Sequence, residues 1–189
     1  MASSVLDRPA ARWADHHQSA RWDSVGKAAN YIPLALAATS GLIRFGAGGD
    51  VAADTARASL LAVGWTLGID YATRFSLGRA RPDQHSGPAS FAGPSKGSAS
   101  SGFPSNHMGM AFAAVTPFAQ RYDAPWLYAI AAATAFGRIQ QQQHFMSDVV
   151  AGSLIGYGMG SMMLDRQRGD RDARVTVGLN RSVNVSWQY

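Results

Sequence analysis

The amino-acid sequence predicts an all-α fold: a helical bundle with a short β-like tail at its C-terminal end. Hydrophobic residues make up 47% of the 189 residues and charged residues only 15%, which excludes a disordered chain and allows one buried core. The apolar residues gather in five segments whose lengths and Ala and Leu content favour helices over strands. In the tail, by contrast, apolar and polar residues alternate as they do in strands.

Each apolar segment is expected to form one helix of a bundle of five or six. The predicted helices cover residues 25–45, 52–75, 106–120, 125–136 and 147–164. A short break at 46–50 and a long loop rich in Gly, Ser and Pro, from Pro82 to Phe103, interrupt the series. Because a loop of about 20 residues inside one domain is unusual and often functional, we favour a functional role for this loop over a disordered insertion.

The tail forms the last predicted element. Apolar residues alternate with polar residues or glycine over 175–179 and again over 183–189, with Asn180-Arg181 as the predicted turn. A linker of mixed charge precedes this segment. The sequence therefore predicts one helical domain over 1–165, with 166–189 as a linker and a short hairpin or strand that is not a separate domain.

Membrane signals in the sequence are weak. The N-terminal residues contain no apolar core of the kind found in signal peptides, so we expect no signal peptide in this chain. The longest charge-free apolar stretches, 28–43 and 149–164, are each shorter than the roughly 20 residues of a spanning helix. We interpret them as buried helices of a soluble or membrane-peripheral bundle, with a compact multi-span protein as the alternative.

The charge balance favours an anionic partner. The formal net charge is +5, which suits phosphate esters, an anionic membrane surface or nucleic acid, although a surplus of charge for solubility explains it equally well. The chain has no cysteine, which excludes disulfides, cysteine metal ligands and a cysteine nucleophile.

Three separated segments carry the candidate catalytic and phosphate-binding residues. The first places three arginines, Arg74, Arg79 and Arg81, just before Pro82. A guanidinium group donates in a planar fork that matches phosphate oxygens, and Pro82 is expected to stop the helix and aim Arg81 at the site. By itself this pattern is also typical of an ordinary basic helix end.

The second segment is Phe103-Pro104-Ser105-Asn106-His107, followed by an apolar helical run. Pro, Ser and Asn before such a run indicate a helix start, where free backbone N–H groups and the helix dipole favour an anion. His107 in the first turn is positioned to give a proton to a leaving oxygen. A plain helix cap with an exposed histidine is the alternative.

The third segment holds Arg138, His144 and Asp148. On a helix, His144 and Asp148 share a face, and a carboxylate hydrogen-bonded to one imidazole nitrogen leaves the other nucleophilic. Arg138 lies six residues before His144, so a straight helix would not present both to one phosphate. We therefore expect a break near the glutamine run; a surface His–Asp pair is the alternative.

Taken in order, Arg-x6-Arg-Pro, Pro-Ser-x-His and Arg-x5-His-x3-Asp resemble the three-part signature of the type 2 phosphatidic acid phosphatase superfamily, which includes lipid phosphate phosphatases, bacterial class A acid phosphatases and vanadium haloperoxidases. The signature covers residues 74–148. The resemblance implies that His144 attacks phosphorus to form a phosphohistidine, that Asp148 orients His144, and that His107 protonates the leaving group and then activates water. It implies that the phosphoryl oxygens are held by Arg74, Arg81, Arg138, Ser105 and Asn106.

This sequence departs from the family pattern at three positions. Arg74 replaces a lysine, Asn106 replaces the glycine of Pro-Ser-Gly-His, and Gly137 replaces a serine before Arg138. A cation is kept at Arg74, and Asn106 keeps its backbone N–H, adds a side-chain donor and tolerates left-handed backbone angles. Arg79 lies off the signature, and we interpret it as a secondary phosphate or surface contact.

By resemblance, the function is that of a metal-independent phosphatase of a phosphomonoester or pyrophosphate, most plausibly of a lipid, in the bacterial envelope. We expect no metal and no cofactor, with vanadate binding as a phosphate mimic. The expected partners are a phosphorylated small molecule or lipid and a peripheral membrane contact, without nucleic acid. Two loop residues, His85 and Lys96, are either substrate contacts or solvated, and we favour the second.

Two alternatives remain at this stage. One is a vanadium-dependent haloperoxidase, which would use the same pocket for vanadate but belongs to a class of much longer chains. The other is a non-catalytic binder of anionic lipid or phosphate, which the three substitutions in the signature make plausible.

Overall fold

The structure is a computed structural model that describes residues 2–46, 50–84, 87–94, 101–177 and 183–187. His85 and Lys96 lie outside the described residues. In chain order the elements are α1 (Ala2–His16), α2 (Ala20–Ala29), α3 (Ile32–Phe45), α4 (Asp50–Leu77), the short 3-10 helix η1 (Pro82–Gln84), α5 (Asn106–Arg121), α6 (Leu127–Gln140), α7 (Met146–Asp172), β1 (Ala173–Val177) and β2 (Val183–Trp187). The predicted all-α fold with a β-like tail is confirmed.

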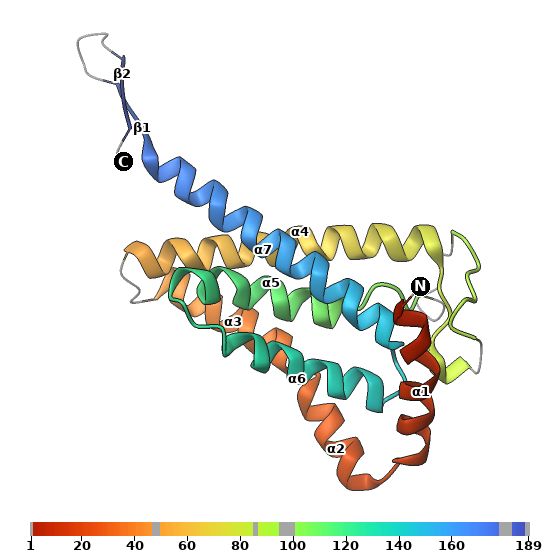
Figure 1. Ribbon diagram of the computed structural model, residues 1–189. Helices are drawn as coiled ribbons and strands as arrows, with labels where there is room; N and C mark the ends of the chain where they lie inside the picture. The colour runs from red at the N-terminus through yellow and green to blue at the C-terminus, as the bar shows by residue number, and fades with distance from the viewer. Residues whose placement is uncertain (1, 47–49, 85–86, 95–100, 178–182, 188–189) are drawn as a thin grey trace.

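Helix α5 lies at the centre of the bundle and packs against α3, α4, α6 and α7. In Figure 1, α4 and α5 lie side by side and α7 crosses them obliquely, while α1 lies at the end of the bundle where α5 and α7 begin. The segment between α4 and α5 folds over that same end. Several chain segments far apart in sequence therefore meet at the N-terminal ends of α5 and α7.

The tail is a two-stranded antiparallel hairpin that pairs Val175 with Val185 and extends beyond the bundle at the far end of α7 (Figure 1). The predicted turn at Asn180-Arg181 lies outside the described residues. The linker expected before the tail is instead helical, because α7 continues without interruption to Asp172.

The close contact between α5 and α7 depends on glycine. Gly152, Gly156 and Gly160 recur every four residues on α7 and therefore share one face. A Cβ atom would lie 2.4 Å from the backbone oxygen of Ser105 at Gly152, and 2.2 Å from the backbone oxygen of Gly109 at Gly156. Only glycine, which has no Cβ atom, allows the two backbones to approach this closely.

The N-terminal part of the bundle was not fully predicted. Residues 25–45 form two helices rather than one, because Pro33 stands in the first turn of α3 and favours a new helix start there. The preceding helix α1 was missed, because Pro9 and frequent charges hide its amphipathic pattern. Helix α4 ends before Gly78, whose φ of +56° turns the chain, so Gly78 and not Pro82 terminates it.

Within the part of the chain that the structure describes, no helix combines the length and the apolar composition needed to cross a membrane.

The glycine contact predicts a large difference between two neighbouring glycines of α7. Gly156→Ala should lower the free energy of unfolding by about 1–3 kcal/mol, because the added methyl group meets the α5 backbone. Gly158→Ala is the matched control, since its Cβ would meet nothing within 4 Å, and it should be neutral or stabilise by up to about 1 kcal/mol. Urea denaturation of both variants measures this, and equal effects would contradict the close-packing explanation.

Candidate functional site

The first predicted segment reaches the end of the bundle through a turn rather than a helix end. After Gly78 the chain runs extended, and Arg79 bridges to Phe91 in the following loop. Arg81 then donates from Nη1 to Gln143 Oε1 at 2.8 Å, in the turn between α6 and α7. Arg74, in the last turn of α4, donates from Nε to Pro104 O at 2.9 Å. Both arginines are thus anchored to the two other predicted segments.

The second segment forms the N-terminus of α5, as predicted. Ser105 is the N-cap residue, but its hydroxyl makes no capping hydrogen bond and is fully buried. Asn106 and His107 occupy the first turn, where backbone N–H groups have no intrahelical partner. Asn106 is helical, so the left-handed conformation that Asn tolerates is not used here. This helix end offers backbone and hydroxyl donors to an anion.

The third segment breaks where the spacing of Arg138 and His144 required it. Helix α6 ends at Gln140, Gln142 adopts a φ of +53°, and α7 begins at Met146. Arg138 therefore lies in the last turn of α6 and His144 in the connecting turn. The prediction that His144 and Asp148 share one helix face is wrong, because α7 begins two residues after His144.

The ring of His144 is buried and held by the backbone. Its Nδ1 lies 2.6 Å from the carbonyl oxygen of Gly102, and because a carbonyl oxygen only accepts, Nδ1 carries the proton. Its Nε2 is then unprotonated. Burial, followed by Arg138 and Arg74, lowers the pKa of His144 well below its usual value, so the ring is neutral at pH 7.

Asp148 does not make the predicted hydrogen bond to His144. The two side chains approach only to 3.7 Å between Oδ2 and Nδ1. Asp148 Oδ2 instead accepts from the backbone N–H of Phe145 at 2.7 Å, as in a capping box at the start of α7. The carboxylate therefore fixes the backbone turn that carries His144, while the carbonyl of Gly102 selects the tautomer.

Arg79 lies beneath this turn and is buried, so its interpretation as a surface or phosphate contact was wrong. Its guanidinium group forms ion pairs with Asp148 and, at 3.0 Å, with Asp7 of α1. Asp7 also accepts from the backbone N–H of Ser147 at 2.8 Å and from its hydroxyl at 2.7 Å. The centroid of the Phe145 ring lies 4.9 Å from the Arg79 guanidinium carbon. The buried charge is thus fully paired and joins α1 to the start of α7.

Four of the five predicted anion-binding residues, all except Arg74, have a buried side-chain atom without a hydrogen-bond partner. Within the described residues these atoms are Arg81 Nε, Ser105 Oγ, Asn106 Oδ1 and Arg138 Nε, and they are accompanied by His107 Nδ1, His144 Nε2, the side-chain amide of Gln140 and the carboxylate of Asp70. Buried polar groups are normally hydrogen-bonded, so such a group of atoms indicates a polar ligand. Other buried atoms without a partner in the described bundle, such as those of Tyr128 and Gln167, do not belong to the three predicted segments.

The electrostatics confirm that the three segments converge. Burial, then Arg81 and Arg74, lower the pKa of Arg138 to about 10. Burial, then Arg138 and His144, lower the pKa of His107 to about 4. Like charges depress the pKa of a cation only at short range, so the arginines and histidines surround a common position. An anion bound there would relieve this repulsion.

An open pocket of about 410 Å³ leads to this position, lined by Lys27, Asn30, Tyr31, Leu34, His107 and Arg138. Asn30 Oδ1 accepts from Arg138 Nη1 at 3.1 Å and so orients the guanidinium group. Lys27 adds a fourth cation at the mouth. The residues from α2 and α3 carry no motif, and only the bend between these helices brings them to the site.

Gly137 has a steric reason to be glycine. A Cβ atom there would lie 2.6 Å from the backbone oxygen of Gly26 on α2. The absence of a side chain allows α2 to pack on α6 and to bring Asn30 against Arg138. The departure from the family's serine therefore accompanies a new support for the same arginine.

A second buried carboxylate lies close to the site. Asp70, one helical turn before Arg74, is fully buried, and neither of its oxygens has a hydrogen-bond partner among the described residues. Burial raises its pKa to about 7, and only Arg74 opposes this. No sequence motif marked this residue.

Fold and site together define a helical-bundle protein with a buried, arginine-rich anion site next to a neutral histidine. A family model for the PAP2 superfamily matches residues 55–169, more than half of the chain, and the chain belongs to this family. The predicted signature, 74–148, lies inside this match.

One curated relative is the lipid A 1-phosphatase of Porphyromonas gingivalis, which is 33% identical over 101 residues. The alignment covers 50% of this chain and 20% of the relative, so the chain spans only a minor part of that protein's length. No solved structure matches the chain.

The Arg79 network predicts that Asp7 is needed for stability. Asp7→Asn should lower the free energy of unfolding by about 3 kcal/mol, because it leaves a buried guanidinium group short of a charge. The matched control is Asp23→Asn, which breaks an exposed pair with Lys27 and should cost less than about 0.5 kcal/mol. Chemical denaturation distinguishes the two, and an Asp7 variant as stable as the control would contradict the assigned role.

Asp70 predicts a pH-dependent effect on stability. Because its pKa is raised from 3.8 to about 7 in the folded protein, its contribution to stability is greatest below pH 4 and is lost as the pH rises through 7. Asp70→Asn stays neutral and should therefore raise the melting temperature at pH 8 more than at pH 5. Asp165→Asn, at an exposed carboxylate, is the control. A pH-independent difference between Asp70→Asn and wild type would overturn this explanation.

Proposed function

We propose that this protein is a metal-independent phosphatase that hydrolyses a phosphomonoester or pyrophosphate of a lipid through a phosphohistidine at His144. The observation that carries the proposal is the convergence of Arg74, Arg81 and Arg138 on the unpaired Nε2 of a neutral, buried histidine. Membership of the PAP2 superfamily supports a phosphatase.

In the first step the lone pair of His144 Nε2 attacks phosphorus, and the bond from phosphorus to the leaving oxygen breaks. The neutral ring is available as a nucleophile because Gly102 O holds the proton on Nδ1. As the imidazole gains positive charge, this carbonyl and the nearby Asp148 carboxylate stabilise it. In this role Asp148 acts across 3.7 Å rather than through a hydrogen bond.

The non-bridging phosphoryl oxygens bind the three arginines and the donors at the start of α5. The guanidinium groups of Arg74, Arg81 and Arg138 supply positive charge that other phosphatases obtain from metal ions. Ser105 Oγ and the N-terminus of α5, beginning at Asn106, add hydrogen-bond donors. Vanadate, with the same charge and geometry, occupies the same position and inhibits.

His107 transfers the protons. It gives a proton to the leaving oxygen in the first step, then takes one from the water that attacks the phosphohistidine, so that phosphate leaves and His144 is regenerated. The low pKa of about 4 applies to the protein without an anion. A bound dianion among the arginines raises this pKa, so that His107 takes up from solvent the proton that it must donate.

The substrate is proposed from the relative and from the charge. The curated relative is named for the 1-phosphate of lipid A, and the cations around the pocket, including Lys27, suit an anionic headgroup. The relative's name and the charge of the pocket both support an amphiphilic phosphate as the substrate. They also agree with a peripheral contact with a bacterial membrane or envelope surface.

The test is hydrolysis of 4-nitrophenyl phosphate and of a panel of lipid phosphates in EDTA, with wild type and His144→Ala. We expect activity that resists EDTA, is inhibited by vanadate and falls at least 1,000-fold in the variant, since removal of a covalent nucleophile lowers kcat by up to about 10⁶-fold. Acid-quenched wild type should carry acid-labile phosphate that the variant lacks. Lys27→Met, at the pocket mouth, should retain folding and part of the activity.

Inactivity of wild type on every phosphate ester would overturn the proposal. Oxidation of halide by peroxide in the presence of vanadate would then identify a haloperoxidase, and phosphate binding without turnover would identify a non-catalytic binder.

The position of His107 predicts proton uptake on anion binding. At pH 5.5 the ring is largely unprotonated in the free protein, and a dianion raises its pKa, so binding should take up a proton. Sulfate serves as the probe because it remains a dianion at this pH. Calorimetric titrations in buffers of different ionisation enthalpy measure the uptake, and His107→Asn should abolish it. Uptake that persists in this variant would exclude His107 as its source.

A further inference from the structure

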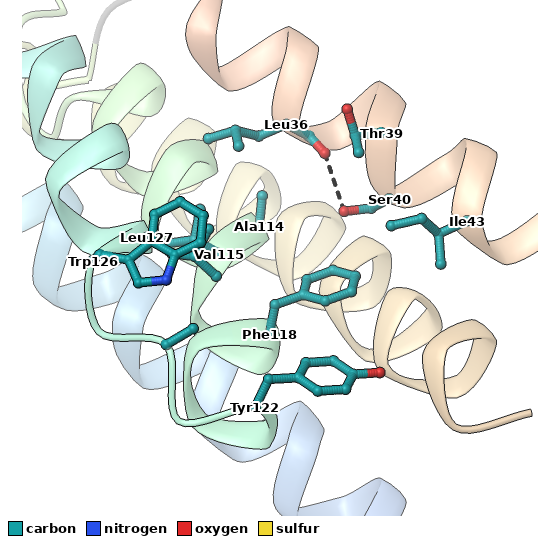
Figure 2. Close-up of a pocket in the computed structure, with 11 residues that line it drawn as sticks. Leu36, Thr39, Ser40, Ile43, Ala114, Val115, Phe118, Tyr122, Trp126 and Leu127 are labelled. Atoms are coloured by element: carbon teal, nitrogen blue, oxygen red, sulfur yellow. Dashed lines mark hydrogen bonds between the residues drawn. The ribbon is translucent and has the colours of Figure 1, made fainter. Parts of the chain in front are cut away.

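A second pocket, of about 300 Å³, lies along α5 beyond the anion site (Figure 2). Its floor is formed by Ala114 and Val115 of α5, and its walls by Ile43 of α3 and Phe118 of α5. Trp126, just before α6, stands at the rim and is 63% exposed. No residue of the three-part signature lines this pocket.

The lining offers a ligand almost nothing but hydrocarbon. Its few polar side-chain atoms belong to Thr39, Ser40, Tyr122 and Trp126. The hydroxyl of Ser40 already donates to Leu36 O at 3.0 Å, the bond drawn in Figure 2, and lies 2.9 Å from Ser59 Oγ. A polar ligand would therefore lose most of its hydrogen bonds to water without replacement. An apolar chain would gain dispersion contacts and lose none.

The two pockets are aligned along the same helices. His107 and Phe118 lie on one face of α5, about 16 Å apart at 1.5 Å per residue. Helix α6 spans the two pockets in the same way. Leu127 at its start lines the apolar pocket, and Arg138 near its end lines the anion pocket. One end of this α3–α5–α6 seam is cationic and the other apolar.

No charged residue interrupts the seam between them. Residues 32–43, 108–120 and 124–137 of the three helices contain neither acidic nor basic side chains. The contact in between is apolar and built largely from small residues, with Ala111 and Ala131 packed against Leu36. Towards the end of α3, Leu42 and Phe45 are 75% and 82% exposed, and the guanidinium group of Arg44 lies over the Phe45 ring.

We propose that this pocket binds the hydrocarbon chain of the amphiphilic phosphate whose headgroup occupies the anion site. The inference rests on the proposed function and adds to it a specificity site for the acyl or alkyl tail. The arrangement of a cationic pocket and an apolar pocket on one uncharged seam matches a molecule with a phosphate at one end and a chain at the other.

The test compares alkyl phosphates of increasing length, ethyl, hexyl and decyl, below their critical micelle concentrations. Each buried methylene should improve binding by up to about fourfold, so wild type should prefer decyl to ethyl phosphate by at least tenfold in kcat/KM, mainly through KM. Ile43→Asp places a carboxylate in the wall and should remove this preference while changing ethyl phosphate hydrolysis less than twofold.

Leu42→Asp is the matched control, since Leu42 is the preceding residue of α3, is exposed and does not line the pocket. It should retain the preference of wild type. A second pair of variants tests the same point by filling the pocket: Thr39→Trp at the rim fills it, and Ala38→Trp, at a residue that does not line it, is the control. This pair keeps the test valid if Ile43→Asp does not fold. A chain-length preference that is absent in wild type, or unchanged in both pocket variants, would overturn the proposal.

A binding measurement separates this proposal from the phosphatase activity. The fluorescent fatty acid cis-parinaric acid should bind wild type and Leu42→Asp, and at least tenfold more weakly Ile43→Asp. If wild type hydrolyses no phosphate ester, the proposed function fails, and this titration still decides the pocket. Equal binding by all three proteins would show that the chain binds elsewhere, or that this surface is covered by a second copy or another protein.

Discussion

The buried guanidinium group of Arg79 is the interaction on which the geometry of the site depends. It is paired with carboxylates from α1 and α7, and it also donates from Nε to Pro88 O at 2.8 Å in the loop that precedes α5. Removing either carboxylate would leave a buried charge without compensation, which costs far more than the loss of a surface pair. Asp7 lies before residues 55–169, the range that matches the PAP2 family, so a helix outside the matched range supports the start of α7 inside it.

The anion site is costly to the folded protein. Burial, then Arg81, lowers the pKa of Arg74, and burial, then Arg81 and Arg74, lowers the pKa of Arg138 to about 10. Within the described residues, several buried polar atoms beside these arginines also lack hydrogen-bond partners. The surrounding helices are therefore held by contacts that do not use these groups: glycine packing between α5 and α7, and the approach of α2 to α6 at Gly137. For the reaction that we propose, a framework held in this way would keep the donors in place before the anion arrives, so that little reorganisation accompanies the development of charge in the transition state.

Helix α5 connects the two chemical properties of the molecule. Its N-terminus supplies Ser105, Asn106 and His107 to the anion site, and its later turns line the apolar pocket. Small residues along this helix allow α3, α6 and α7 to approach, and the length of α5 sets the distance between the candidate anion site and the apolar pocket. Small side chains explain the packing on both sides of α5, because they do not keep the backbones apart. On one side they form the glycine-rich contact with α7, and on the other the uncharged seam with α3 and α6.

Sequence alone determined the all-α class and the residues expected at the anion site, because helical periodicity and arginine, serine and histidine chemistry are local properties. It also required a break between Arg138 and His144, which the turn after Gln140 provides. Tertiary structure decided what no local pattern encodes: that Arg79 is buried, that Asp7, 72 positions earlier in the sequence, pairs with it, and that the carbonyl of Gly102 takes the position expected for Asp148. A hydrogen-bond partner is selected by distance in space, and these distances exist only after segments far apart in sequence have packed together.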